Sequence, residues 1–153
     1  MKSLAERALC VIESRLRGIR TEDGYATDAG LNVFRARRKL GTDECPAAVV
    51  WDLGETVTAS QGSRDEIDLL VGIEVHVPAG DCGSLLEAVK ADAKRTVRPT
   101  ANKDVLRDSP GTIRYDGAVL FAREDGAETE SITLKFIVHY TEVVGDPTST
   151  GNK

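Results

Sequence analysis

Histidine is the side chain in this sequence best suited to hold a metal or move a proton near neutral pH. His76 and His139 each occupy the polar phase of a segment with alternating apolar residues, so both fit one face of a sheet. A metal site ordinarily needs at least three converging protein ligands, and the alternative is two strand histidines with ordinary polar partners. The sequence therefore predicts no metal site and no cofactor.

Cysteine is the other candidate for chemistry. Cys10, Cys45 and Cys82 are widely separated, odd in number and without a C-x-x-C pair, which favours free thiols over a disulfide or zinc site. Cys82 precedes a predicted helix, whose dipole would lower a thiol pKa. A small buried thiol is the commoner state of cysteine, and no histidine lies nearby in the sequence.

Familiar catalytic motifs are absent from the sequence, which has no Walker A loop, G-x-G-x-x-G, H-E-x-x-H, G-x-S-x-G or EF-hand loop. The chain is thus predicted not to be an enzyme. Arg35, Arg37, Arg38 and Lys39 form its one basic cluster. The cluster fits a phosphate-contacting patch or an edge strand protected by positive charge.

Charge and composition exclude further classes of protein. The 153 residues carry 25 acids against 20 bases, a net charge of -5, which argues against strong binding to nucleic acid. Hydrophobic residues make up 41% and charged residues 29%, as in a globular domain. No run of 18 apolar residues occurs, and Glu6 lies where a signal peptide would be apolar. We expect a cytosolic, soluble chain.

Two helices and several strands must position these residues. Ser3 and Glu6 form a capping box that starts a helix, and Gly18 supplies a left-handed residue at its end. Ser84 and Glu87 repeat the box before a second helix that stops at Pro99. Apolar alternation predicts the strands 32–38, 47–60, 69–77, 113–123 and 128–143.

Polar segments connect these elements. Residues 21–30 and 61–68 are predicted loops, the second a hairpin loop, and 100–111 is a connector. At Asp116-Gly117 the strand 113–123 is either bulged or folded into a tight hairpin. The pattern predicts an α+β fold, with a single mixed, largely antiparallel β-sheet packed against two α-helices. It comprises one domain, 1–144, and a disordered C-terminal tail, 145–153.

Several segments spread over nearly the whole chain resemble the tail terminator (tail completion) proteins of long-tailed phages, the lambda minor tail protein U family. The segments that carry the resemblance are RTEDGYATDAG (20–30), VFR (33–35), PAAV (46–49), VHVP (75–78), KADAKR (90–95), VHYTE (138–142) and Asp146-Pro147.

The resemblance implies a structural virion protein, made in the host cytoplasm and located at the head-proximal end of the tail. It would form a ring, in this family a hexamer, that caps the tail tube protein, ends tube polymerisation and meets the head-tail connector protein. Duplex DNA would pass through the lumen without specific binding. The net charge of -5, rather than the resemblance, motivates the hypothesis that acidic side chains line the lumen and repel the DNA. No membrane is involved.

A cyclic ring requires two different patches on each subunit. The two polar loops and the basic cluster supply the candidates for contacts with a neighbouring subunit or the tube. These are Asp23, Tyr25, Arg35, Arg37, Gln61, Arg64, Asp65 and Glu66. Two alternatives are another phage neck or tail-tube subunit, and a small cytosolic enzyme or ligand-binding domain.

Overall fold

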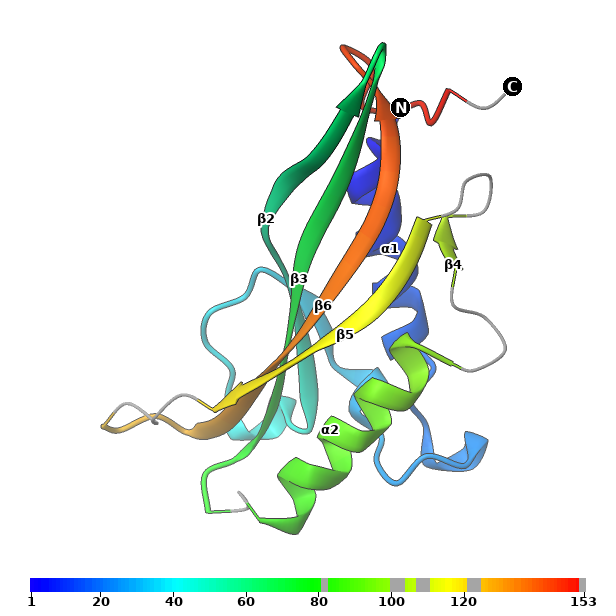
Figure 1. Ribbon diagram of the computed structural model, residues 1–153. Coiled ribbons are helices and arrows are strands. Elements are labelled where there is room, and N and C mark those ends of the chain that lie inside the picture. Colours follow the sequence, from blue (N-terminus) through cyan, green and yellow to red (C-terminus); the bar gives the residue numbers. More distant parts are fainter. Residues whose placement is uncertain (81–82, 100–103, 107–110, 121–124, 152–153) are drawn as a thin grey trace.

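A six-stranded sheet with two helices on one face organises the chain (Figure 1). The computed structural model describes residues 1–80, 83–99, 104–106, 111–120 and 125–151. The helices are α1 (Leu4–Arg17) and α2 (Ser84–Val97), and the strands, in sheet order, are β1 (Val33–Arg35), β2 (Ala47–Gln61), β3 (Arg64–Pro78), β6 (Thr129–Val143), β5 (Gly111–Leu120) and β4 (Asp104–Leu106). β1 is parallel to β2 and the other pairs are antiparallel, which confirms the predicted α+β fold.

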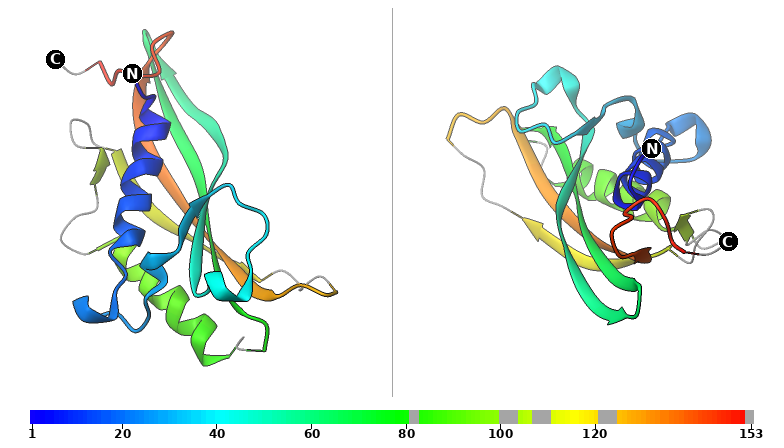
Figure 2. Two further views of the ribbon diagram at one scale, coloured as in Figure 1. Left: turned by 180° about the vertical axis from the view of Figure 1, so that it is seen from behind. Right: turned by 90° about the horizontal axis from the view of Figure 1, so that it is seen from above.

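Alternation along β3 and β6 gives the sheet two different faces. Ile73 of β3 and Leu134 of β6 are opposite each other and fully buried. The residues two positions away on either strand are buried as well. Both helices lie on this side, which we call the helix face (Figure 2). The other side, which includes Gly72 and Lys135, we call the open face. The alternation predicted for both strands is confirmed.

The start of α1 follows the sequence prediction, and its end does not. The Ser3 hydroxyl accepts a hydrogen bond from the Glu6 backbone N–H at 3.1 Å. Gly18, however, has φ −77°, so the predicted left-handed C-cap is wrong. The chain instead continues in a tight turn, with the Ile19 N–H bonded to the Leu16 carbonyl, because Ile19 itself is buried in the core.

The predicted capping box of α2 is also wrong. Gly83 occupies the N-cap position, and Ser84 is already the first helical residue. The apolar face of α2 is as expected: Leu86, Val89 and Ala93 are buried against the sheet. The helix is thus specified by its apolar spacing rather than by a serine cap.

The predicted hairpin loop at 61–68 is wrong, because the strands continue through it. β2 ends at Gln61 and β3 begins at Arg64, so the loop is the two-residue turn Gly62-Ser63, with Gly62 at φ +62°. Residues 52–66, which we call the arm, therefore form a long hairpin whose tip extends past the N-terminal end of α1 (Figure 1). Polar residues on both faces of an exposed hairpin look like a loop in the sequence.

In three further segments the structure differs from the sequence prediction or decides between two predicted conformations. The strand expected at 32–38 is shortened to β1, and Ala36 has φ +52°. Asp116-Gly117 is a bulge within one strand, because the pairing of β5 with β6 shifts between Tyr115 and Ala118. Part of the expected connector, Asp104–Leu106, pairs with β5 as β4.

The segment 145–151 is held by hydrogen bonds, although its composition predicts a disordered tail. The Leu4 N–H donates to the Pro147 carbonyl at 2.8 Å, and the Arg64 guanidinium donates to the Gly151 carbonyl at 2.7 Å. Residues 152 and 153 lie outside the described part of the chain. The C-terminal segment thus packs beside the N-terminal end of α1 and the tip of the arm.

Candidate functional site

The two histidines lie on the same face of the sheet and far from each other. His76 pairs with Ser131, eight residues along β6 from His139, or roughly 26 Å at about 3.3 Å per residue. His76 contacts Thr129 and Glu74 through its two ring nitrogens, and His139 contacts Asp68 at 2.7 Å. The described residues hold no cluster of three metal-ligating side chains.

The two described cysteines have different surroundings, and the Cys10 sulfur accepts a hydrogen bond from Lys2 and donates one to Glu6, both at 3.2 Å. Cys10 and Cys45 are free thiols, and burial, with Glu44 and Asp43 nearby, raises the pKa of the Cys45 thiol to about 11. A thiol with so high a pKa is almost entirely protonated at neutral pH and is a poor nucleophile. Cys82 lies outside the described residues.

The basic cluster is partly neutralised within the chain. Arg35 donates to Glu13 and to Glu6 of α1, the latter at 2.9 Å. Arg37 forms an ion pair with Glu44, and its guanidinium lies 4.5 Å from the centre of the Phe34 ring. These two arginines thus fasten β1 and the segment after it to their surroundings.

The predicted interface residues lie in two groups, apart from the two arginines. At the tip of the arm, Asp65 accepts a hydrogen bond from Ser60, and the tip also contains Gln61, Arg64 and Glu66. Tyr25 lies in the loop beside α2, under the guanidinium of Arg95 at 4.0 Å from its ring centre. Asp23 is exposed in the same loop. The two groups are at opposite ends of the molecule, and their part in an interface stays a prediction (Figure 1).

A groove on the open face is the feature that the sequence did not predict. It has a volume of about 260 Å³ and is lined by side chains of four neighbouring strands. The lining residues are Trp51 and Leu53 of β2, Glu74 of β3, Thr133 and Lys135 of β6, and Val119 of β5. Its walls are apolar, with one carboxylate and one ammonium group between them.

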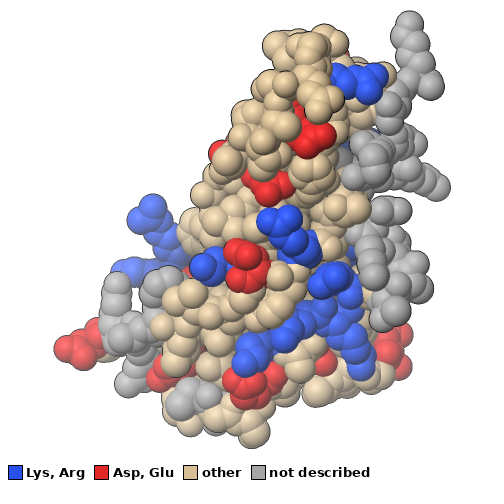
Figure 3. Space-filling model, viewed as in Figure 1, with Lys and Arg blue, Asp and Glu red and all other residues tan. Residues whose placement is uncertain are grey.

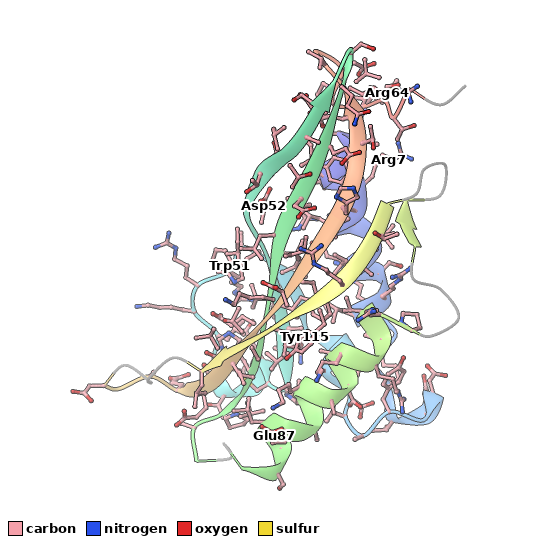
Figure 4. All side chains as sticks on the ribbon, in the orientation of Figure 1. Arg7, Trp51, Asp52, Arg64, Glu87 and Tyr115 are labelled. Atoms are coloured by element: carbon pink, nitrogen blue, oxygen red, sulfur yellow. The ribbon has the colours of Figure 1, made fainter. Side chains whose placement is uncertain are left out.

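Gly72 shapes the floor of this groove. A Cβ atom at Gly72 would lie 2.8 Å from Leu53 Cδ1, so glycine lets the Leu53 side chain fold across β3. Leu53 is exposed by 46% and lies at a bulge in β2. It follows Trp51 and Asp52, which Figure 4 labels on the same strand. A glycine inside a strand of apolar alternation was the only sequence signal for a close approach at this point.

Two polar groups of the groove lack partners. Trp51 Nε1 is buried and has no hydrogen-bond partner, the sole such side-chain atom found in the described residues. Within the same described set, Lys135 forms no ion pair. A buried donor without an acceptor costs about 1–3 kcal/mol, so a ligand or partner that offers an acceptor gains affinity here.

The arm carries a second distinctive surface, on the helix face. Asp65 and Glu142 are directly opposite each other on β3 and β6, and Glu55 is close enough to affect Glu142. In the described part of the chain no Lys, Arg or His forms an ion pair with these carboxylates. Val57 lies between them on β2 and is exposed by 54%. Like charges directly across a strand pair are destabilising.

Burial and the neighbouring carboxylates shift the pKa values of two ionisable side chains on β6. Burial, and then the charges of Glu55 and Asp65, raise the pKa of Glu142. Burial and the neighbouring carboxylates likewise raise the pKa of Tyr140, whose hydroxyl donates to Glu55 at 3.2 Å. Figure 3 looks onto the open face, where acidic side chains also appear in the upper part of the molecule and Lys and Arg gather below them. The arm is an acidic surface around an exposed valine.

The raised pKa of Glu142 predicts an unusual dependence of stability on pH. Its charged form is disfavoured in the folded state, so the free energy of unfolding carries a penalty above the folded pKa. The penalty disappears as the pH falls through that pKa toward the ordinary carboxyl value. We expect Glu142→Gln to be more stable than the parent at pH 7, with the difference shrinking toward pH 4. Urea unfolding across this range measures it, and a constant difference would contradict the assignment.

No family model and no curated protein sequence matches the chain. In the described residues no helix has the length and apolar character required to cross a membrane.

Proposed function

We propose that the chain is the subunit of a ring that caps a phage tail tube, ends its polymerisation and forms the interface for head-tail joining. One observation carries the proposal: the subunit has two different unpartnered surfaces, the acidic arm on the helix face and the apolar groove on the open face. Two unlike patches are what a cyclic assembly requires of each subunit. The sequence resemblance described above supports the same role.

The size of the chain also supports a ring. A domain of 153 residues has a radius of gyration of about 15 Å, too small to enclose duplex DNA alone. A passage for DNA would thus have to be formed by several copies. The net charge of -5 suits a lumen along which DNA slides without binding.

Native mass spectrometry of the purified protein tests the ring. We expect a closed oligomer, six copies by the resemblance, at micromolar concentration, and a monomer at all concentrations would overturn the proposal. A functional test adds the protein to polymerising tail tube subunits. Growth should stop and tubes should stay short. Deletion of the gene from its phage should give tubes of uncontrolled length, whereas tubes of normal length would contradict a terminator role.

A further inference from the structure

The groove and the arm complement each other in charge. The groove combines the apolar side chains of Trp51, Leu53 and Val119 with the unpaired ammonium of Lys135. Arg114 of β5, on the same face, is already paired with Asp68 at 3.5 Å, and Glu74 in the groove contacts His76. Lys135 is therefore the lining charge that has no ion-pair partner among the described residues. An occupant of the groove should be apolar, with a carboxylate that can reach Lys135.

The helix face of the arm has this composition. Val57 and Glu55 are two residues apart on β2, and both are exposed, so they form an apolar and acidic pair on one face. Asp65 and Glu142 add two carboxylates next to them without cationic partners in the described residues. A volume of about 260 Å³ suits an anchoring side chain better than a drug-sized ligand, whose pockets reach about 300–1,000 Å³.

One molecule cannot bring these surfaces together. The arm presents Val57 on the helix face, whereas the groove opens on the other side of the same sheet. The hairpin would have to leave its pairing with β6 to reach the groove of its own chain. Docking of one copy into the next remains possible, and it leaves one arm and one groove free until the assembly closes.

We propose that the arm of one copy docks into the open-face groove of a second copy of this chain, with Val57 against Trp51 and Leu53 and with Glu55 near Lys135. This inference rests on the proposed function, and it specifies which surfaces join the subunits. Glu55 of the arm gains in Lys135 the cationic partner that no described residue of its own chain provides. An arm carbonyl also offers the Trp51 N–H an acceptor once the indole turns toward it.

Charge exchange tests the pairing. Lys135→Glu places a carboxylate opposite Glu55 of the arm, and Glu55→Lys places an ammonium group opposite Lys135. We expect each variant alone to associate at least tenfold more weakly than the parent, because like charges face each other in the interface. Mixed in equal amounts, the two variants have complementary charges at both contacts, so the oligomer should return with alternating subunits. The double variant Lys135→Glu/Glu55→Lys should also assemble.

Two charge-reversal variants outside the proposed interface serve as controls. Arg17→Glu reverses an exposed cation of α1 away from the groove, and Glu87→Lys reverses an exposed acid of α2. Both should leave the native mass unchanged. Circular dichroism and the thermal midpoint check that every variant is folded, and recovery on mixing provides a second check, since a misfolded chain cannot be rescued by its counterpart.

The outcomes separate this inference from the proposed function. If the parent forms an oligomer and neither Lys135→Glu nor Glu55→Lys weakens it, the docking is wrong while the ring stands. If each variant is weakened but mixing restores nothing, the two residues do not face each other and the docking is likewise overturned. If the parent stays monomeric at high concentration, the ring and the docking both fail.

Discussion

Asp92→Ala is expected to lower the free energy of unfolding by about 3 kcal/mol, because it leaves buried hydrogen-bond donors without an acceptor. Asp92, on α2, is exposed by only 4% and accepts hydrogen bonds from the backbone and hydroxyl of Thr27, both at 2.8 Å, and from the Ala26 N–H at 3.2 Å. Thr27 is itself buried. A single carboxylate thus fastens the loop 21–30 to the second helix.

Chemical unfolding measures this effect. Glu87→Ala on the same helix is the matched control, since Glu87 is exposed and its ion pair with Lys90 is a surface contact worth less than about 1 kcal/mol. Asp92→Asn should fall between the parent and Asp92→Ala, because the amide retains one acceptor oxygen. Equal stability of Asp92→Ala and Glu87→Ala would show that the loop is not held by Asp92.

Gly30→Ala is expected to cost a similar amount, about 3 kcal/mol, by overpacking. A Cβ atom at position 30 would lie 2.6 Å from the carbonyl oxygens of Arg17 and Ile19. These are backbone atoms at the end of α1, and the Gly30 N–H donates to the same Ile19 carbonyl at 3.0 Å. The side chain cannot be accommodated unless the loop leaves the helix.

Gly83→Ala is the control for this glycine. No described atom lies within 4 Å of the position that a Cβ at Gly83 would take, so Gly83→Ala causes no overpacking. We expect a cost of about 1 kcal/mol, which comes from the N-cap backbone, where alanine is less favourable than glycine. Thermal and urea unfolding of the two variants give the comparison. Amide exchange of residues 21–30 should speed up in Gly30→Ala, and unchanged exchange would contradict the close packing of the loop on α1.

The loop 21–30 illustrates what a sequence conveys and what it omits. Its polar composition and two glycines correctly predict a long connection between α1 and the first strand. They do not reveal that Asp92, 65 residues after Thr27, holds it in place. A hydrogen bond between distant residues leaves no local pattern, so nothing in the spacing of the loop marks its partner.

For the arm, the sequence predicts a loop where the structure has two paired strands. Residues 61–68 are polar on every position but one, and local composition cannot separate an exposed strand from a loop. Backbone pairing makes residues 64–68 part of a strand. Their register with β6 runs from Ile67 to Arg64 without interruption, and β2 pairs with the same residues through a bulge between Val57 and Ala59. Exposure on both faces removes the alternation by which a strand is usually recognised.

The sequence by itself determined the α+β class, both helices and the buried faces of β3 and β6, because apolar periodicity is a local property that burial enforces residue by residue. Only the tertiary structure decided where the unpartnered surfaces lie. The groove joins Trp51, Val119 and Lys135 from three strands that are far apart in the chain. Strand order brings them together, and strand order depends on the packing of the whole sheet rather than on any one segment.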